Sequence, residues 1–94
     1  MEVSLAARVS VPPDVLISKV GDESVILDLD SERYFGLDAV GTHMWKALTT
    51  SDTVQAAYEQ LLGEYEVDAE VLRQDLLNLI GILRERGLVE VYVE

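Results

Sequence analysis

The chain offers few side chains that could act as a nucleophile, a general base or a metal ligand. It has one histidine, His43, and no cysteine, which excludes a thiol nucleophile, a disulfide scaffold and a zinc–thiolate site. No G-x-S-x-G elbow surrounds any serine. His43 has no second histidine with which to share a metal, so we interpret it as a structural residue. The sequence therefore predicts no catalytic residue, no metal site and no cofactor.

Acidic residues are the other group that could do chemistry, as ligands for a cation. Asp28, Asp30 and Glu32 alternate as in part of a calcium loop, but the glycine and the distal glutamate of an EF-hand are missing. A solvated turn is the better interpretation of these carboxylates. The second acidic stretch, residues 64–70, leads into the start of a predicted helix, where negative charge is favourable.

The composition limits the classes of protein that this chain can belong to. Its 94 residues allow one domain, and 49% hydrophobic residues exclude a disordered acidic tail. With 18 acidic against 7 scattered basic residues the formal net charge is −11, so nucleic-acid binding is not expected. No apolar run could span a bilayer, and the N-terminus does not resemble a signal peptide. We expect a cytoplasmic protein.

Strand-like periodicity occupies the first part of the chain. Apolar residues alternate over residues 3–11 until two prolines end the run, which makes this segment either an edge strand or a flexible arm. Three further β-favouring runs, joined by turn residues, predict an antiparallel meander over residues 15–20, 25–29 and 33–37.

After residue 38 the apolar period changes to about 3.6 residues, which indicates helices. Three helices are predicted to begin at Asp38, Asp52 and Asp68. The second helix is predicted to end at Gly63, and the third to run to about Arg86 with Gly87 at the C′ position. Alternating valines after Gly87 indicate a short final strand.

This order of elements predicts an α+β fold of winged helix-turn-helix type, with a three-stranded antiparallel sheet followed by three helices. Extra strands are expected at both termini. We divide the chain into an N-terminal arm or edge strand, residues 1–14, and one domain, residues 15–94.

The strand Arg33–Leu37 has features that a small stable domain does not require. As the last strand of a meander it is an edge, with unpaired backbone donors and acceptors, unless another segment covers it. It carries adjacent aromatic residues and a glycine, and none of the lysines or prolines that commonly protect an edge. The alternative is that the aromatic residues pack on the two sheet faces and that the C-terminal strand covers the edge.

The third predicted helix has an apolar surface that is wider than one core usually requires. Its apolar arc also contains a carboxylate, Asp75, which needs a partner if it is buried. The excess apolar surface either binds something outside this chain or packs in a core that surrounds the helix on two sides. An open strand edge beside such a helix would suit an extended peptide that adds as a strand.

Several motifs resemble the PqqD-like family of peptide-recognition elements. They are Leu27-Asp28-Leu29-Asp30-Ser31-Glu32-Arg33-Tyr34-Phe35-Gly36-Leu37-Asp38, Gly41-Thr42-x-Met44-Trp45, Tyr65-Glu66-Val67-Asp68, and Leu83-Arg84-Glu85-Arg86-Gly87-Leu88-Val89. The resemblance covers residues 15–93. It implies a winged-helix fold that performs no chemistry and binds the leader segment of a ribosomally synthesised precursor peptide.

The resemblance also implies where the leader binds and which proteins cooperate. The leader would add to the third strand of the meander and lie against the third helix, and the implied peptide-binding residues are Arg33, Tyr34, Phe35, Gly36, Leu37, Leu72, Asp75, Leu76 and Leu79. Similarity to the free-standing lasso-peptide branch implies presentation of the precursor to a separate leader protease and cyclase. Acidic residues beside this groove would favour a leader with basic residues near its anchors.

Three other functions stay open at this point. The chain could be a PqqD-type chaperone that delivers a precursor to a radical SAM enzyme. It could be a winged-helix DNA-binding regulator, although its third helix mixes arginines with acidic residues. It could also form a homodimer through a terminal strand.

Overall fold

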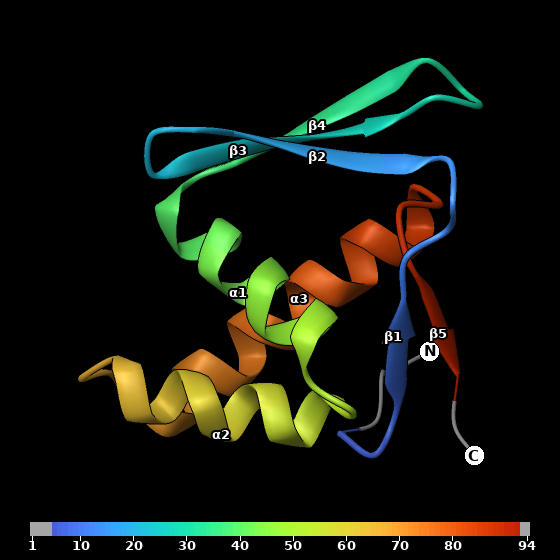
Figure 1. Cartoon of the computed structure of the whole chain (residues 1–94). Helices are drawn as coiled ribbons and strands as arrows, with labels where there is room; N and C mark the ends of the chain where they lie inside the picture. The colour runs from blue at the N-terminus through green and yellow to red at the C-terminus, as the bar shows by residue number, and fades with distance from the viewer. Residues whose placement is uncertain (1–4, 93–94) are drawn as a thin grey trace.

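A computed structural model of the protein describes residues 5–92, so the predictions for Val3 and Val93 lie outside the described residues. In Figure 1 the larger sheet lies on one side of the molecule and the helices on the other, with a smaller sheet at the side. No helix within residues 5–92 is long and apolar enough to cross a membrane.

The larger sheet is the predicted antiparallel meander. It is formed by β2 (Val15–Val20), β3 (Glu23–Asp28) and β4 (Arg33–Leu37), in the spatial order β2-β3-β4. Asp28 closes the turn between β3 and β4, because its carboxylate accepts hydrogen bonds from the Asp30 amide and the Ser31 hydroxyl, each at 3.0 Å. The acidic stretch at this position is therefore a turn, as interpreted from the sequence.

Two of the three predicted helix starts are confirmed. The helices are α1 (Ala39–Thr50), α2 (Val54–Glu64) and α3 (Ala69–Glu85). Asp38 accepts from the Gly41 amide at 2.7 Å, and Asp68 accepts from two amides at the start of α3. Both side chains thus satisfy amides that have no partner within the helix.

The prediction that Asp52 caps the second helix is wrong. The N-cap of α2 is Thr53, whose side chain accepts from the Ala56 amide at 3.1 Å, while the Gln55 side chain bonds to Glu59 instead of completing a capping box. The helix also continues to Glu64, one residue beyond the predicted end.

The terminal segments pair with each other. β1 (Arg8–Ser10) and β5 (Glu90–Tyr92) form the two-stranded antiparallel sheet, with Val9 opposite Val91. The N-terminal run is thus a strand in the structure. The alternative in which the C-terminal strand covers β4 is wrong, because β5 uses β1 as its partner (Figure 1).

Two buried clusters hold these layers together. One lies among the three helices and includes Leu61, Leu76 and Ile80; the other joins the larger sheet to α1 and α3 through Ile26 and Leu83. Side chains of β1, β5 and α3 pack against both clusters. The predicted α+β fold, with three strands followed by three helices and with added terminal strands, is confirmed.

Candidate functional site

β4 is an open edge of the larger sheet among the described residues. Its only strand partner in residues 5–92 is β3, which pairs with it from Asp28↔Arg33 to Ser24↔Leu37. Its outer side therefore presents backbone donors and acceptors that could pair with another extended chain. Neither proline nor lysine occurs in this strand to prevent such pairing.

The side chains of β4 alternate between the two faces of the sheet. Leu37 is buried in the core and Phe35 lies on the same face, opposite the fully buried Ile26. Tyr34 points to the other face and is 76% exposed. The Arg86 guanidinium carbon lies 5.2 Å from the centre of the Phe35 ring, a cation–π contact that places the C-terminal end of α3 beside β4.

One stripe of α3 and its C-cap, exposed except at the partly buried Leu79, ends at the contact between Arg86 and Phe35 of β4. Its members recur at intervals of three and four residues and therefore share a face: Val71, Asp75, Leu79, Ile82 and Arg86. Val71 and Ile82 are 55% and 42% exposed, which is unusual for aliphatic side chains on a core helix. Part of the wide apolar surface predicted for this helix is thus exposed, with no segment of residues 5–92 packed on it.

An apolar cavity of about 200 Å³ lies at the N-terminal end of this stripe. It is lined by Val40, Met44, Tyr65, Val67, Val71, Leu72 and Asp75. The three lining valines are about half exposed, while Met44 and Leu72 are buried and form the floor. The cavity could accept an apolar side chain, and the exposed Asp75 could hold a basic group beside it.

Together these features border the surface that a strand added to β4 would cover, with β4 and the start of α1 on one side and the α3 stripe on the other. The Phe35–Arg86 contact marks one end and the Val40–Val71 cavity marks the other. β4 and α3 therefore run in opposite directions along it. We refer to this feature as the β4–α3 groove.

The nine residues predicted for peptide binding fall into two groups. Leu37, Leu72 and Leu76 are 5%, 4% and 0% exposed, so their side chains belong to the core beneath the groove. The other six have accessible surface along the groove or the strand edge: Arg33, Tyr34, Phe35, Gly36, Asp75 and Leu79.

Some groove residues were not predicted from the sequence. Val40, Tyr65 and Val67 come from the start of α1 and from the segment between α2 and α3, and only the tertiary fold brings them to one cavity. The signal that could have found Val67 is an apolar residue between two acidic ones in a loop, where no core position explains it.

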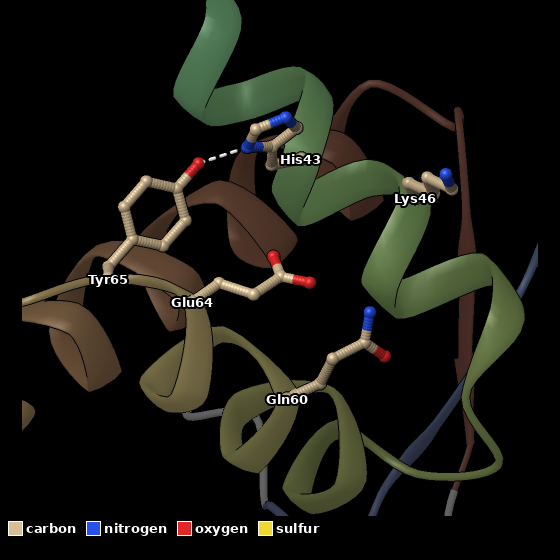
Figure 2. A pocket seen from close by; sticks show the side chains of 5 residues that line it. All are labelled: His43, Lys46, Gln60, Glu64 and Tyr65. Atoms are coloured by element: carbon tan, nitrogen blue, oxygen red, sulfur yellow. Dashed lines mark hydrogen bonds between the residues drawn. The ribbon is translucent and has the colours of Figure 1, made fainter.

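A second, polar pocket of about 380 Å³ adjoins the groove on the other side of Tyr65. Figure 2 shows its lining residues between α1 and α2: His43, Lys46, Gln60, Glu64 and Tyr65. A hydrogen bond joins the Tyr65 hydroxyl to His43 Nδ1. Burial raises the pKa of the Tyr65 phenol, and the carboxylates of Glu64 and Asp38 raise it further. The phenol therefore stays protonated and hydrogen-bonding at neutral pH.

The family model for coenzyme PQQ synthesis protein D (PqqD) matches residues 23–89, from the start of β3 to the residue before β5. A search of curated proteins gives no match.

Two solved structures, both of complexes with a leader peptide, are similar to most of the chain. One is TbiB1 in complex with the TbiA(beta) leader peptide, with 30% sequence identity, a TM-score of 0.81, and coverage of 90% of this chain and 99% of that one. The other is a lasso peptide synthetase B1 complexed with the leader peptide, with 22% identity, a TM-score of 0.78, and coverage of 88% and 98%. Since the family model matches more than half of the sequence, the chain belongs to the PqqD family.

Proposed function

We propose that this protein binds the leader segment of a ribosomally synthesised precursor peptide in lasso-peptide maturation. The observation that carries the proposal is the open edge of β4 beside an exposed apolar stripe of α3. The leader would add as a strand to β4, gaining backbone hydrogen bonds, and place alternate side chains against α3. Similarity to two proteins solved with leader peptides supports this assignment.

The apolar cavity provides the anchor site in this proposal. A leader strand on β4 directs every second side chain towards α3, and the side chain nearest the start of α1 would reach the cavity. Asp75 at the cavity and Glu32 before β4 would favour basic leader residues on either side of the anchor.

In this function the chain performs no chemistry of its own. It would hold the precursor while a separate leader protease and a cyclase act on it, in the cytoplasm where such precursors are made. The family description favours a second candidate, delivery of a precursor to a radical SAM enzyme in quinone-cofactor synthesis. Both candidates use the β4–α3 groove and differ in the peptide that it binds.

Titration of a fluorescently labelled lasso leader peptide tests the proposal. Wild-type protein should bind it at micromolar concentrations. Val71→Asp should weaken binding at least tenfold, because it places a carboxylate beside the apolar cavity. An acidic residue is tolerated in the first turn of α3, so the fold should survive. The matched control is Val20→Asp, which changes an exposed valine on β2, away from the groove (69% exposed, against 55% for Val71).

Three results would contradict the proposal. Equal binding by Val71→Asp and wild type would place the peptide elsewhere on the protein. Absence of leader binding, together with salt-dependent binding of duplex DNA, would favour the regulator instead. Preference for a quinone-cofactor precursor over the lasso leader would favour the second candidate.

A further inference from the structure

Both lysines and the only histidine of this acidic chain lie around one pocket. The pocket has a volume of about 400 Å³ and lies between β2 and α1, and its lining includes Ile17, Lys19, His43, Trp45 and Lys46. Lys19 and Lys46 are the only lysines of the sequence. Among the described residues that line the pocket, none is acidic. The fold thus concentrates basic side chains at one place on a protein whose net charge is −11.

The basic side chains reach this pocket from two elements. Ile17 and Lys19 alternate along β2 with the buried Val15, so they share the sheet face that is directed towards the helices. His43 and Lys46 are three residues apart on α1 and therefore share one side of that helix (Figure 2). Neither lysine forms a salt bridge within the described part of the chain. Their charges are therefore available to a ligand.

The chemistry of the pocket favours an acidic peptide segment as its ligand. Ile17 is 40% exposed and lies beside the almost completely buried Trp45, which gives the pocket an apolar floor below the lysines. Carboxylates on a peptide would be attracted here and repelled by the acidic surface elsewhere. A polyanion as large as duplex nucleic acid would meet that acidic surface as well, which opposes its binding.

Shared lining residues connect this pocket to the β4–α3 groove. His43 and Lys46 also line the polar pocket between α1 and α2, and Tyr65 of the polar pocket lines the apolar cavity of the groove. A peptide that leaves the groove at the cavity could therefore cross α1 along His43 and Lys46 and reach Lys19 on β2. We refer to Lys19, His43 and Lys46 as the α1–β2 basic site.

On the basis of the proposed function, we propose that the α1–β2 basic site binds an acidic segment of the precursor peptide, beyond the segment that adds to β4. Asp75 and Glu32 favour basic residues next to the anchor in the groove. The basic site favours acidic residues further along the same peptide. Together the two sites would select a precursor by its charge pattern. They would also fix which end of the added strand lies at the cavity, because a reversed strand would carry the acidic segment away from α1.

The test compares two labelled peptides by fluorescence anisotropy. One is the full-length cognate precursor, and the other is the same peptide with every aspartate and glutamate replaced by asparagine and glutamine. The variant Lys19→Gln/Lys46→Gln changes two exposed positions of the basic site. At low ionic strength it should bind the native precursor about fivefold more weakly than wild type, the effect of two exposed ion pairs. It should bind the neutralised precursor as wild type does, and added salt should reduce the difference for the native one.

A matched control separates a local effect from a change in net charge. Arg73→Gln/Arg84→Gln removes the same amount of positive charge from the side of α3 opposite the exposed stripe. This variant should bind both peptides within twofold of wild type. Thermal unfolding followed by circular dichroism checks that each variant is folded.

The outcomes separate the basic site from the proposed function. If wild-type protein binds neither peptide, the proposed function itself fails. If it binds the native precursor but the lysine variant binds that precursor equally well, or loses affinity for both peptides to the same extent, the basic site does not bind precursor carboxylates. Unchanged affinity for both peptides, together with weaker binding of the purified leader protease, would instead identify an acidic partner protein as the occupant.

Discussion

At the scale of single residues, Tyr65 connects the apolar cavity with the polar pocket. Its ring lines the cavity on the α3 side, while its hydroxyl bonds to His43 on the other side (Figure 2). The only histidine of the sequence thus holds one wall of the groove in place. This agrees with the interpretation of His43 as a structural residue and adds a role that the sequence did not reveal.

We predict that Tyr65→Phe weakens leader binding modestly. The ring remains in the cavity, but loss of one hydrogen bond of about 0.5–1 kcal/mol should reduce the affinity roughly two- to fivefold. The control is Tyr58→Phe, which removes a hydroxyl that donates to the Ala69 carbonyl at 3.0 Å outside the cavity. Fluorescence anisotropy should show unchanged affinity for Tyr58→Phe. An equal loss in both variants would mean that Tyr65 acts only through general stability.

At the scale of elements, the end of α3 depends on Gly87. This residue has φ +73°. The Gly87 amide donates to the Arg84 carbonyl at 3.0 Å and the Leu88 amide to the Leu83 carbonyl at 2.9 Å, the two bonds of a Schellman motif. The turn brings Leu88 and Val89 back into the core and starts the return towards β5.

We predict opposite effects for two glycine-to-alanine changes at and within α3. Gly87→Ala should lower the free energy of unfolding by about 1 kcal/mol, because a Cβ is strained at positive φ. Gly81→Ala should raise it by about 0.5–1 kcal/mol, since Gly81 is helical and its new Cβ would meet no atom within 4 Å. Urea unfolding measures both values. Stabilisation by Gly87→Ala would show that the motif does not fix the end of the helix.

The ends of the helices show which structural features the sequence could predict. Asp38, Asp68 and Gly87 act through neighbours within three to five residues, so local patterns identified them correctly. Thr53 was missed because Asp52 and Thr53 are both residue types that cap helices. The segment before β1 decides between them, since the Leu5 and Ala7 carbonyls accept hydrogen bonds from the first amides of α2. The sequence also identified the strand and helix that border the groove. The cavity between them depends on packing among α1, α3 and the loop before α3, which no local pattern encodes.

At the scale of the whole molecule, the terminal segments belong to the same packed unit as the helices. Ala7 is fully buried between helices, and Val9 packs against both core clusters. The Val54 amide donates to the Ala7 carbonyl at 2.9 Å and the Gln55 amide to the Leu5 carbonyl at 2.8 Å. The segment before β1 therefore satisfies helix-end amides of α2 as well as filling the core.

We predict from this packing that Ala7→Asp destabilises the entire protein. A carboxylate at a position with no exposed surface lacks a partner in the apolar cluster, so the free energy of unfolding should fall by about 3 kcal/mol or more. Ala6→Asp, at the exposed neighbouring position, should change it by less than about 0.5 kcal/mol. If residues 1–14 were an independent arm, the two variants would unfold alike in urea. A single cooperative transition, shifted only in Ala7→Asp, would instead show that β1 and the groove fold together.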